Sequence, residues 1–185
     1  MESTYGNRSH GGTPNYVEDL TDIFKRTFER GGNVVIPSFA VGRTQELLYI
    51  IRKIKEDNLV GRDFDVYMDS PLAIEATNIF IKNVESCFDS SPVVAYLSPG
   101  NVSGLIPFLT SSTASSSKQI NFDPNPKVII SSSGMCEAGR IRHHLKHNLW
   151  RPECTIVFVG YQAVGTTGRI IVDGDVLFFP LHTYL

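Results

Sequence analysis

Cysteine is scarce in this chain, and neither a long apolar run nor an excess of one charge is present. The three cysteines, Cys87, Cys136 and Cys154, are odd in number and far apart. This spacing argues against a disulfide framework and against a cysteine zinc site, and it predicts free, buried thiols. No apolar run approaches the roughly 18 residues of a membrane span, and no secretory signal pattern is found. We therefore expect an intracellular, cytoplasmic protein with no membrane partner.

The formal net charge of −2 does not indicate a surface that binds nucleic acid as a whole, so any anion site must be local. Two phosphate-binding motifs are also missing, since neither a Walker-type loop nor a G-x-G-x-x-G follows the first expected strand. A chain of 185 residues is long enough to bury roughly two thirds of its unfolded surface. We expect one domain that spans residues 1–185.

Segments with helical periodicity alternate with short strand-like segments along the chain. Helices are expected at 17–28, 44–57, from Pro71 onward, 115–121, 138–149 and 164–174, and strands at 33–38, 64–69, 127–133 and 154–161. The stretch 89–117 is rich in Ser, Pro and Gly and is predicted to be mostly loop. For the helix that begins at Pro71, the periodicity places five apolar residues inward: Leu72, Ala76, Ile79, Phe80 and Val84. The alternation predicts an α/β fold of three layers, a mainly parallel sheet with helices on both faces.

Each of the four expected strands is followed by Ser or Gly and then by the start of a helix. In open α/β sheets this carboxyl edge binds ligands, because loop N–H groups and helix N-termini favour anions there. Ser70 follows one strand, and the turn of Ser132, Ser133, Gly134 and Met135 follows another. The N–H groups of that turn are candidates to cradle a phosphate, and a glycine allows the ligand to approach closely. One such loop is an ordinary turn, whereas four at one edge favour a site.

The segment 138–151 contains four cations and three histidines but no acid. On a helix, Ile141, Leu145 and Leu149 share one face, and Arg140, His143, His144 and His147 share another. This strip is either a solvated helix face or a surface for phosphates. In the second case Arg140, His144 and Lys146 are candidates to contact a nucleic-acid backbone without reading its sequence. A zinc site at His143 and His147 is disfavoured, since no Glu accompanies the first histidine and no third ligand is evident.

Five motifs then point to a family: ESTYGNRSH, GGNVVIPSFAVGRTQELL, MDSPLA, VIISSSGMCEAGRIRHHLKHNL and VFVGYQAVGTTGRIIVDG. In order and spacing they resemble the β-CASP domain of RNA-processing nucleases with the metallo-β-lactamase fold, over about Glu2 to Gly174. The resemblance implies that the complete enzymes cleave phosphodiester bonds in RNA, or in DNA for some relatives, with two zinc ions. It also implies that this domain is an insertion that caps the metal-bearing half.

The resemblance assigns roles to single residues. Glu2 matches the acid that pairs with a histidine from beyond the insertion and helps proton transfer to the leaving group. Arg43 matches the GR motif and is expected to bind phosphate at a helix start, or else to be a structural residue paired with an acid such as Glu46. His182 is not carried over as catalytic, because it comes too early and lacks the following Asp.

The zinc-binding His-x-His-x-Asp-His stretch is absent from the sequence. We therefore expect a fragment of a larger enzyme that has no metal site of its own and no activity alone. Its expected partners are RNA and the metallo-β-lactamase half of its own chain, and a homodimer is left open. The alternative is a free-standing α/β module that binds a nucleotide or another phosphorylated ligand.

Overall fold

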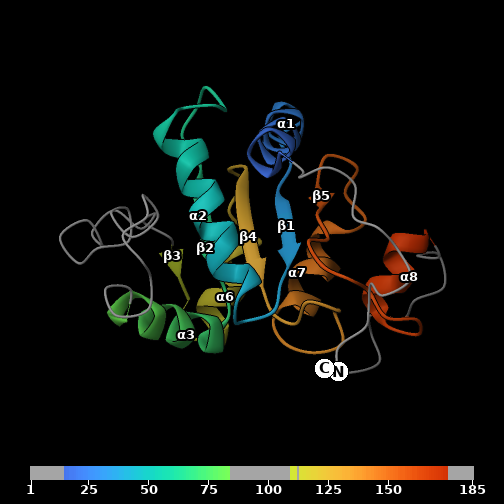
Figure 1. Ribbon diagram of the computed structural model, residues 1–185. Coiled ribbons are helices and arrows are strands. Elements are labelled where there is room, and N and C mark those ends of the chain that lie inside the picture. Colours follow the sequence, from blue (N-terminus) through green and yellow to red (C-terminus); the bar gives the residue numbers. More distant parts are fainter. Residues whose placement is uncertain (1–14, 84–108, 112, 175–185) are drawn as a thin grey trace.

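The computed structural model describes residues 15–83, 109–111 and 113–174, and they contain a five-stranded sheet in the order β3-β2-β4-β1-β5 (Figure 1). Every strand pair is parallel, so the expectation of a parallel α/β sheet is confirmed. The strands are β1 (Val34–Pro37), β2 (Asp65–Met68), β3 (Leu109–Thr110), β4 (Lys127–Ser131) and β5 (Thr155–Ile156). In register, Val34 lies opposite Val128 on β4 and Thr155 on β5.

Helices cover both faces of the sheet, which gives three layers. They are α1 (Tyr16–Glu29), α2 (Arg43–Glu56), α3 (Pro71–Lys82), α6 (Ala114–Ile120), α7 (Ile141–Asn148) and α8 (Thr167–Asp173). Successive strand residues face opposite sides. Val34 and Ile36 therefore join the core beneath α1, α2 and α3, whereas Val35 joins the core beneath α6, α7 and α8.

Side-chain caps explain where several helices begin. Ser70 precedes α3 and accepts a hydrogen bond from the Ala73 N–H at 3.3 Å, while Pro71 occupies the first helical position. Proline is favoured there because its missing N–H would have no partner in the helix. Thr166 caps α8 in the same way as Ser70 caps α3. These caps fix the helix starts at the carboxyl edge of the sheet.

The strand expected at 154–161 is shorter than predicted, since β5 ends at Ile156. Its last contact with β1 is the Val157 N–H donating to the Val35 carbonyl at 2.9 Å. The next rung of a parallel ladder requires an N–H from Pro37, which proline lacks. The pairing therefore stops, although the sequence beyond Ile156 stays apolar.

The predicted inward face of α3 is wrong for Leu72 and Ile79, whereas Ala76 and Phe80 are half-buried. Leu72 and Ile79 are 62% and 64% exposed, and the buried residues are Ala73 and Thr77. The two small side chains bring the helix against the first core and let Thr77 hydrogen-bond to Gln45 of α2 at 2.8 Å. Val84 lies outside the described residues.

Four further boundaries differ from the predictions. β4 ends at Ser131 instead of at residue 133, and α8 begins at Thr167 instead of at residue 164. β3 falls within the stretch predicted to be loop, and its two residues are too few to show an alternating pattern. α7 begins at Ile141 rather than at Ala138, because Gly139 has a left-handed φ of 82° and Ala138 closes a turn with Ser133. The short helix expected at 115–121 is confirmed by α6. Among the described residues, no helix is long and apolar enough to cross a membrane.

Candidate nucleic-acid interface

The loops that follow β1, β2 and β4 are tied to one another at the carboxyl edge of the sheet. The Ser38 N–H donates to the Ser131 carbonyl at 3.0 Å, and the Asp69 N–H donates to the Ile130 carbonyl at 2.9 Å. Beyond them, the hydroxyls of Ser70 and Ser132 lie 3.0 Å apart. The structure thus brings together two residues that the sequence nominated from separate motifs.

Asp69 is the centre of this edge, and sequence reasoning missed it. Its carboxylate is fully buried. Oδ1 accepts from Arg140 Nη1 at 2.6 Å and from the Ser111 hydroxyl, and Oδ2 accepts from the Ser117 hydroxyl at 2.5 Å and from His144 Nε2 at 2.7 Å. Burial alone raises the pKa of Asp69, but these hydrogen bonds outweigh it and hold the pKa well below its ordinary value. The sequence offered two signals, an acid placed directly after a buried strand and its membership of the MDSPLA motif, but neither assigned Asp69 a role.

Arg140 and His144 are brought together by Asp69. Arg140 also donates from Nη1 to the Ser111 carbonyl at 3.0 Å, and its side chain is 22% exposed. His144 is fully buried, so its expected contact with a phosphate and its place on an exposed strip are wrong. The cause is the carboxylate behind α7, which draws His144 inward and neutralises part of the predicted basic strip.

A chain of buried amides continues from His144 toward the opposite edge of the sheet. Asn148 Nδ2 donates to the His144 carbonyl at 2.8 Å and to Asn121 Oδ1 at 3.1 Å, and Asn148 Oδ1 accepts from Asn33 at 2.8 Å. His144 Nδ1 lies 3.0 Å from Asn121 Oδ1, and His144 Nε2 lies 2.7 Å from Asp69 Oδ2, so both ring nitrogens have a hydrogen-bond partner.

The turn of Ser133, Gly134 and Met135 is fixed through its side chain and its carbonyl groups. The Ser133 hydroxyl accepts from the N–H groups of Glu137 and Ala138, and the Ser133 N–H donates to the Ala138 carbonyl at 3.0 Å. Ser133 therefore closes the turn, which removes its N–H from the predicted phosphate cradle. The Gly134 carbonyl accepts from Gln162 and the Met135 carbonyl accepts from Gly168.

Two donors of the predicted cradle remain at this turn. Within the described ranges, the N–H groups of Gly134 and Met135 have no hydrogen-bond partner. Gly134 lies against the ring of Phe39, because a Cβ added there would lie 2.8 Å from a ring carbon. The glycine is therefore needed for the approach of Phe39 as well as for any approach of a ligand.

The helix that follows the fourth expected strand, α8, does not begin with a free N–H group at Thr167. The Thr167 N–H at the start of α8 donates to Glu137 Oε1 at 2.5 Å. This backbone hydrogen bond is the largest cause of the lowered pKa of Glu137. An internal carboxylate thus takes the place that an anionic ligand would occupy.

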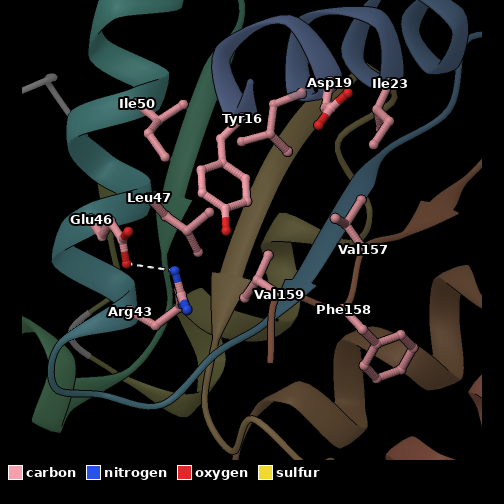
Figure 2. Close-up of a pocket in the computed structure, with 11 residues that line it drawn as sticks. Tyr16, Asp19, Ile23, Arg43, Glu46, Leu47, Ile50, Val157, Phe158 and Val159 are labelled. Atoms are coloured by element: carbon pink, nitrogen blue, oxygen red, sulfur yellow. Dashed lines mark hydrogen bonds and ion pairs between the residues drawn. The ribbon is translucent and has the colours of Figure 1, made fainter. Parts of the chain in front are cut away.

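Arg43 is the first residue of α2, as expected, and it forms an ion pair with Glu46 at 2.6 Å. Both side chains are nearly half exposed, so the pair is worth only about 0–1 kcal/mol. Arg43 lines a cavity of about 220 Å³ between α1, α2 and the residues after β5, where Figure 2 shows it between Glu46 and Val159. Arg43 thus pairs with Glu46, the acid that the alternative interpretation of Arg43 as a structural residue requires.

The remaining nominated residues differ in their settings. Lys146 lies in the last turn of α7, is partly exposed and forms no ion pair with any described residue. Glu2 lies outside the described residues. The described residues contain no group of three or more His, Cys, Asp or Glu that could hold a metal ion.

The histidines and the buried acid do not fit the two zinc ions that the resemblance implies. His143 and His147 pack edge to face with ring centroids 4.5 Å apart. Burial is the main reason that the pKa of His143 is lowered to about 4. Two ligands fall short of the three that a hydrolytic zinc site uses. Both oxygens of Asp69 are already taken by donors.

Comparison with known proteins matches residues 44–171 to the Beta-Casp domain. The chain belongs to this family. The matched residues of the Beta-Casp domain run from the first turn of α2 into α8, so they include Asp69, Arg140 and the serine edge. The resemblance seen in the sequence is thereby confirmed.

Relatives of the Beta-Casp domain are described as ribonucleases and as a termination factor. The chain is 36% identical over 176 residues to "Ribonuclease TTHA0252" of Thermus thermophilus, covering 92% of this chain and 39% of that protein. It is 33% identical over 180 residues to "Transcription termination factor FttA" of Methanosarcina mazei, covering 94% and 27%. It is 33% identical over 177 residues to "RNase J-like protein" of Methanocaldococcus jannaschii, covering 94% and 39%. The chain thus spans well under half the length of these relatives.

Proposed function

We propose that this chain is the substrate-binding cap of a zinc-dependent hydrolase that cleaves RNA, and that it holds RNA phosphates at the carboxyl edge of its sheet. The observation that carries the proposal is the cluster of polar groups at the carboxyl edge of the sheet. Three loops are tied together around the Ser70–Ser132 pair and Arg140, next to two N–H groups that have no hydrogen-bond partner among the described residues. Relatives named as ribonucleases support RNA as the substrate.

Within this proposal, the nominated residues have two kinds of role. Seven of them bind the RNA backbone: Arg43, Ser70, Ser132, Gly134, Met135, Arg140 and Lys146. Ser133 contributes by shaping the turn, since its N–H is used internally. His144 orients Asp69 from inside the protein and does not touch the substrate. Contacts of this kind recognise phosphate and ribose and leave the base sequence unread.

The chemistry of cleavage is assigned to another part of the proposed enzyme. Two zinc ions held by a metallo-β-lactamase half would supply an activated water when bound. That half is the proposed partner within the same chain, with Glu2 as its proton-transfer residue, and the site would lie in the cytoplasm. The residues described here bind and orient RNA, so the 185-residue chain alone is expected to be inactive. A homodimer remains compatible with this role.

Binding of a short, labelled, single-stranded oligouridylate to the 185-residue chain tests the proposal. We expect affinity to fall with salt, with log K decreasing by about 0.7 per phosphate contact for each log unit of salt. The variant Lys146→Ala should reduce that slope by about 0.7. Lys53→Ala is the matched control, because Lys53 is an exposed lysine in the last turn of α2, which covers the other face of the sheet from α7.

Two outcomes would contradict the proposal. If the chain binds no RNA at low salt, the cap role is wrong. If uridine monophosphate competes as well as the oligomer does, the alternative of a nucleotide-binding module is favoured, because a backbone-tracking surface gains affinity from several phosphates.

A further inference from the structure

Phe39 is a large aromatic side chain that is 50% exposed at the carboxyl edge of the sheet. It is the second residue after the end of β1, and part of its ring rests on the backbone of Gly134. A Cβ added to Gly134 would lie 2.8 and 2.9 Å from two carbons of that ring. The ring therefore packs against Gly134, while half of the residue remains exposed to solvent.

The loop that holds Phe39 is fixed by hydrogen bonds. The Thr44 hydroxyl donates to the Phe39 carbonyl at 2.6 Å, and Gln45 Nε2 donates to the Ala40 carbonyl at 3.1 Å. Gly134, which contacts the ring, is held in turn by Gln162, which donates to the Gly134 carbonyl at 3.0 Å. The backbone that carries the ring and the backbone of Gly134 are thus both held by hydrogen bonds before any ligand arrives, which reduces the entropy lost on binding.

The surroundings of Phe39 match the two parts of a nucleotide. Gly134, which supports the ring, and Met135 carry the two N–H groups that have no partner in the described part of the chain. Such groups favour a phosphate. An exposed aromatic face beside them favours the flat base that the phosphate carries, because every base has a face that can stack.

We propose that Phe39 is a stacking platform for one base of single-stranded RNA bound at this edge. The inference rests on the proposed function, and it adds a contact with the base to contacts with the backbone. Stacking of this kind tolerates any base, so it strengthens binding without selecting a sequence. It also predicts that the chain prefers unpaired strands, since a base within a duplex does not expose its face.

The test compares an oligouridylate with an abasic oligomer of the same length and phosphate number, both binding to the 185-residue chain. Phe39→Ala should weaken binding of the oligouridylate by about 5- to 150-fold and leave binding of the abasic oligomer unchanged. Phe39→Trp should keep the wild-type affinity. Phe39→Leu keeps an apolar contact with Gly134 but has no flat ring, so it should behave as the alanine variant does.

Controls separate stacking from folding and from the proposed function. Val41→Ala alters a 70% exposed side chain in the same loop and should leave both affinities unchanged. The salt slope should be the same in every variant, because no phosphate contact is removed. If the wild-type chain binds both oligomers equally, Phe39 is not a platform although the backbone site stands. If Phe39→Leu binds as the wild type does, an apolar packing role replaces stacking. If neither oligomer binds, both proposals fail.

Discussion

Replacing the buried Asp69 with asparagine should destabilise the protein by about 3–5 kcal/mol, the usual cost of breaking a buried ion pair from one side. The structure sets this magnitude, because the carboxylate is fully buried and accepts from four donors, including Arg140 and His144. An amide of the same shape presents one acceptor oxygen and an NH₂ group. It therefore leaves Arg140 without a counter-charge and turns a donor toward His144 Nε2.

Urea unfolding of the wild type and of Asp69→Asn measures this difference. The matched control is Asp63→Asn, because the Asp63 side chain is 89% exposed and pairs with Lys55 at 2.9 Å. Screened pairs of this kind contribute at most about 1 kcal/mol. A loss in Asp69→Asn no larger than in the control would refute the reasoning. If Asp69→Asn does not fold, Ser117→Ala removes one donor to Asp69 and should cost about 1 kcal/mol.

Further predictions concern the turn, a histidine, an exposed arginine and the metal. Gly134→Ala should lose about 1–3 kcal/mol in urea unfolding because its Cβ meets the ring of Phe39, and Phe39→Ala should remove most of that loss. The pKa of His143 is lowered to about 4, so the folded protein takes up the proton at lower pH than the unfolded chain does. The free energy of unfolding should therefore be highest above pH 6.5 and should fall as the pH drops from 6.5 toward 4. His143→Leu should flatten this dependence. Arg43→Ala should change stability by less than about 1 kcal/mol, since its pair with Glu46 is exposed; a larger loss would mean a structural anchor. Metal analysis of the purified chain should find no tightly held zinc.

The sequence predicted most of the architecture because its local signals agree with the fold. Strands such as Val34–Pro37 and Lys127–Ser131 have consecutive apolar residues and are buried on both faces, as strands covered by helices require. Pro71 placed the start of α3, and the GR motif placed Arg43 at the start of α2. These features depend on neighbours in the chain, and neighbours are visible in a sequence.

What the sequence did not predict depends on contacts between distant segments. Periodicity favoured Leu72 over Ala73 on α3 because it ranks hydrophobicity and ignores how closely a helix sits against its neighbours. His144 looked like part of an exposed strip because the acid that buries it lies 75 positions earlier. The convergence of Ser70, Ser132 and Arg140 was foreseen only in part, since the MDSPLA motif contains Asp69 but does not show that its carboxylate reaches Arg140 and His144 in a distant segment.

The order of the strands has a consequence for how the protein is made. β4 lies between β1 and β2, which both precede it in the chain. These two strands therefore cannot join one sheet until β4, which ends at residue 131, has been synthesised. Each of them pairs with β4 over four residues, across large separations in the chain. Such non-local pairing slows folding. A nascent chain that stops before Lys127 would thus expose the apolar strands Val34–Pro37 and Asp65–Met68 without their shared partner, which makes the emergence of β4 from the ribosome the step that permits the sheet to close.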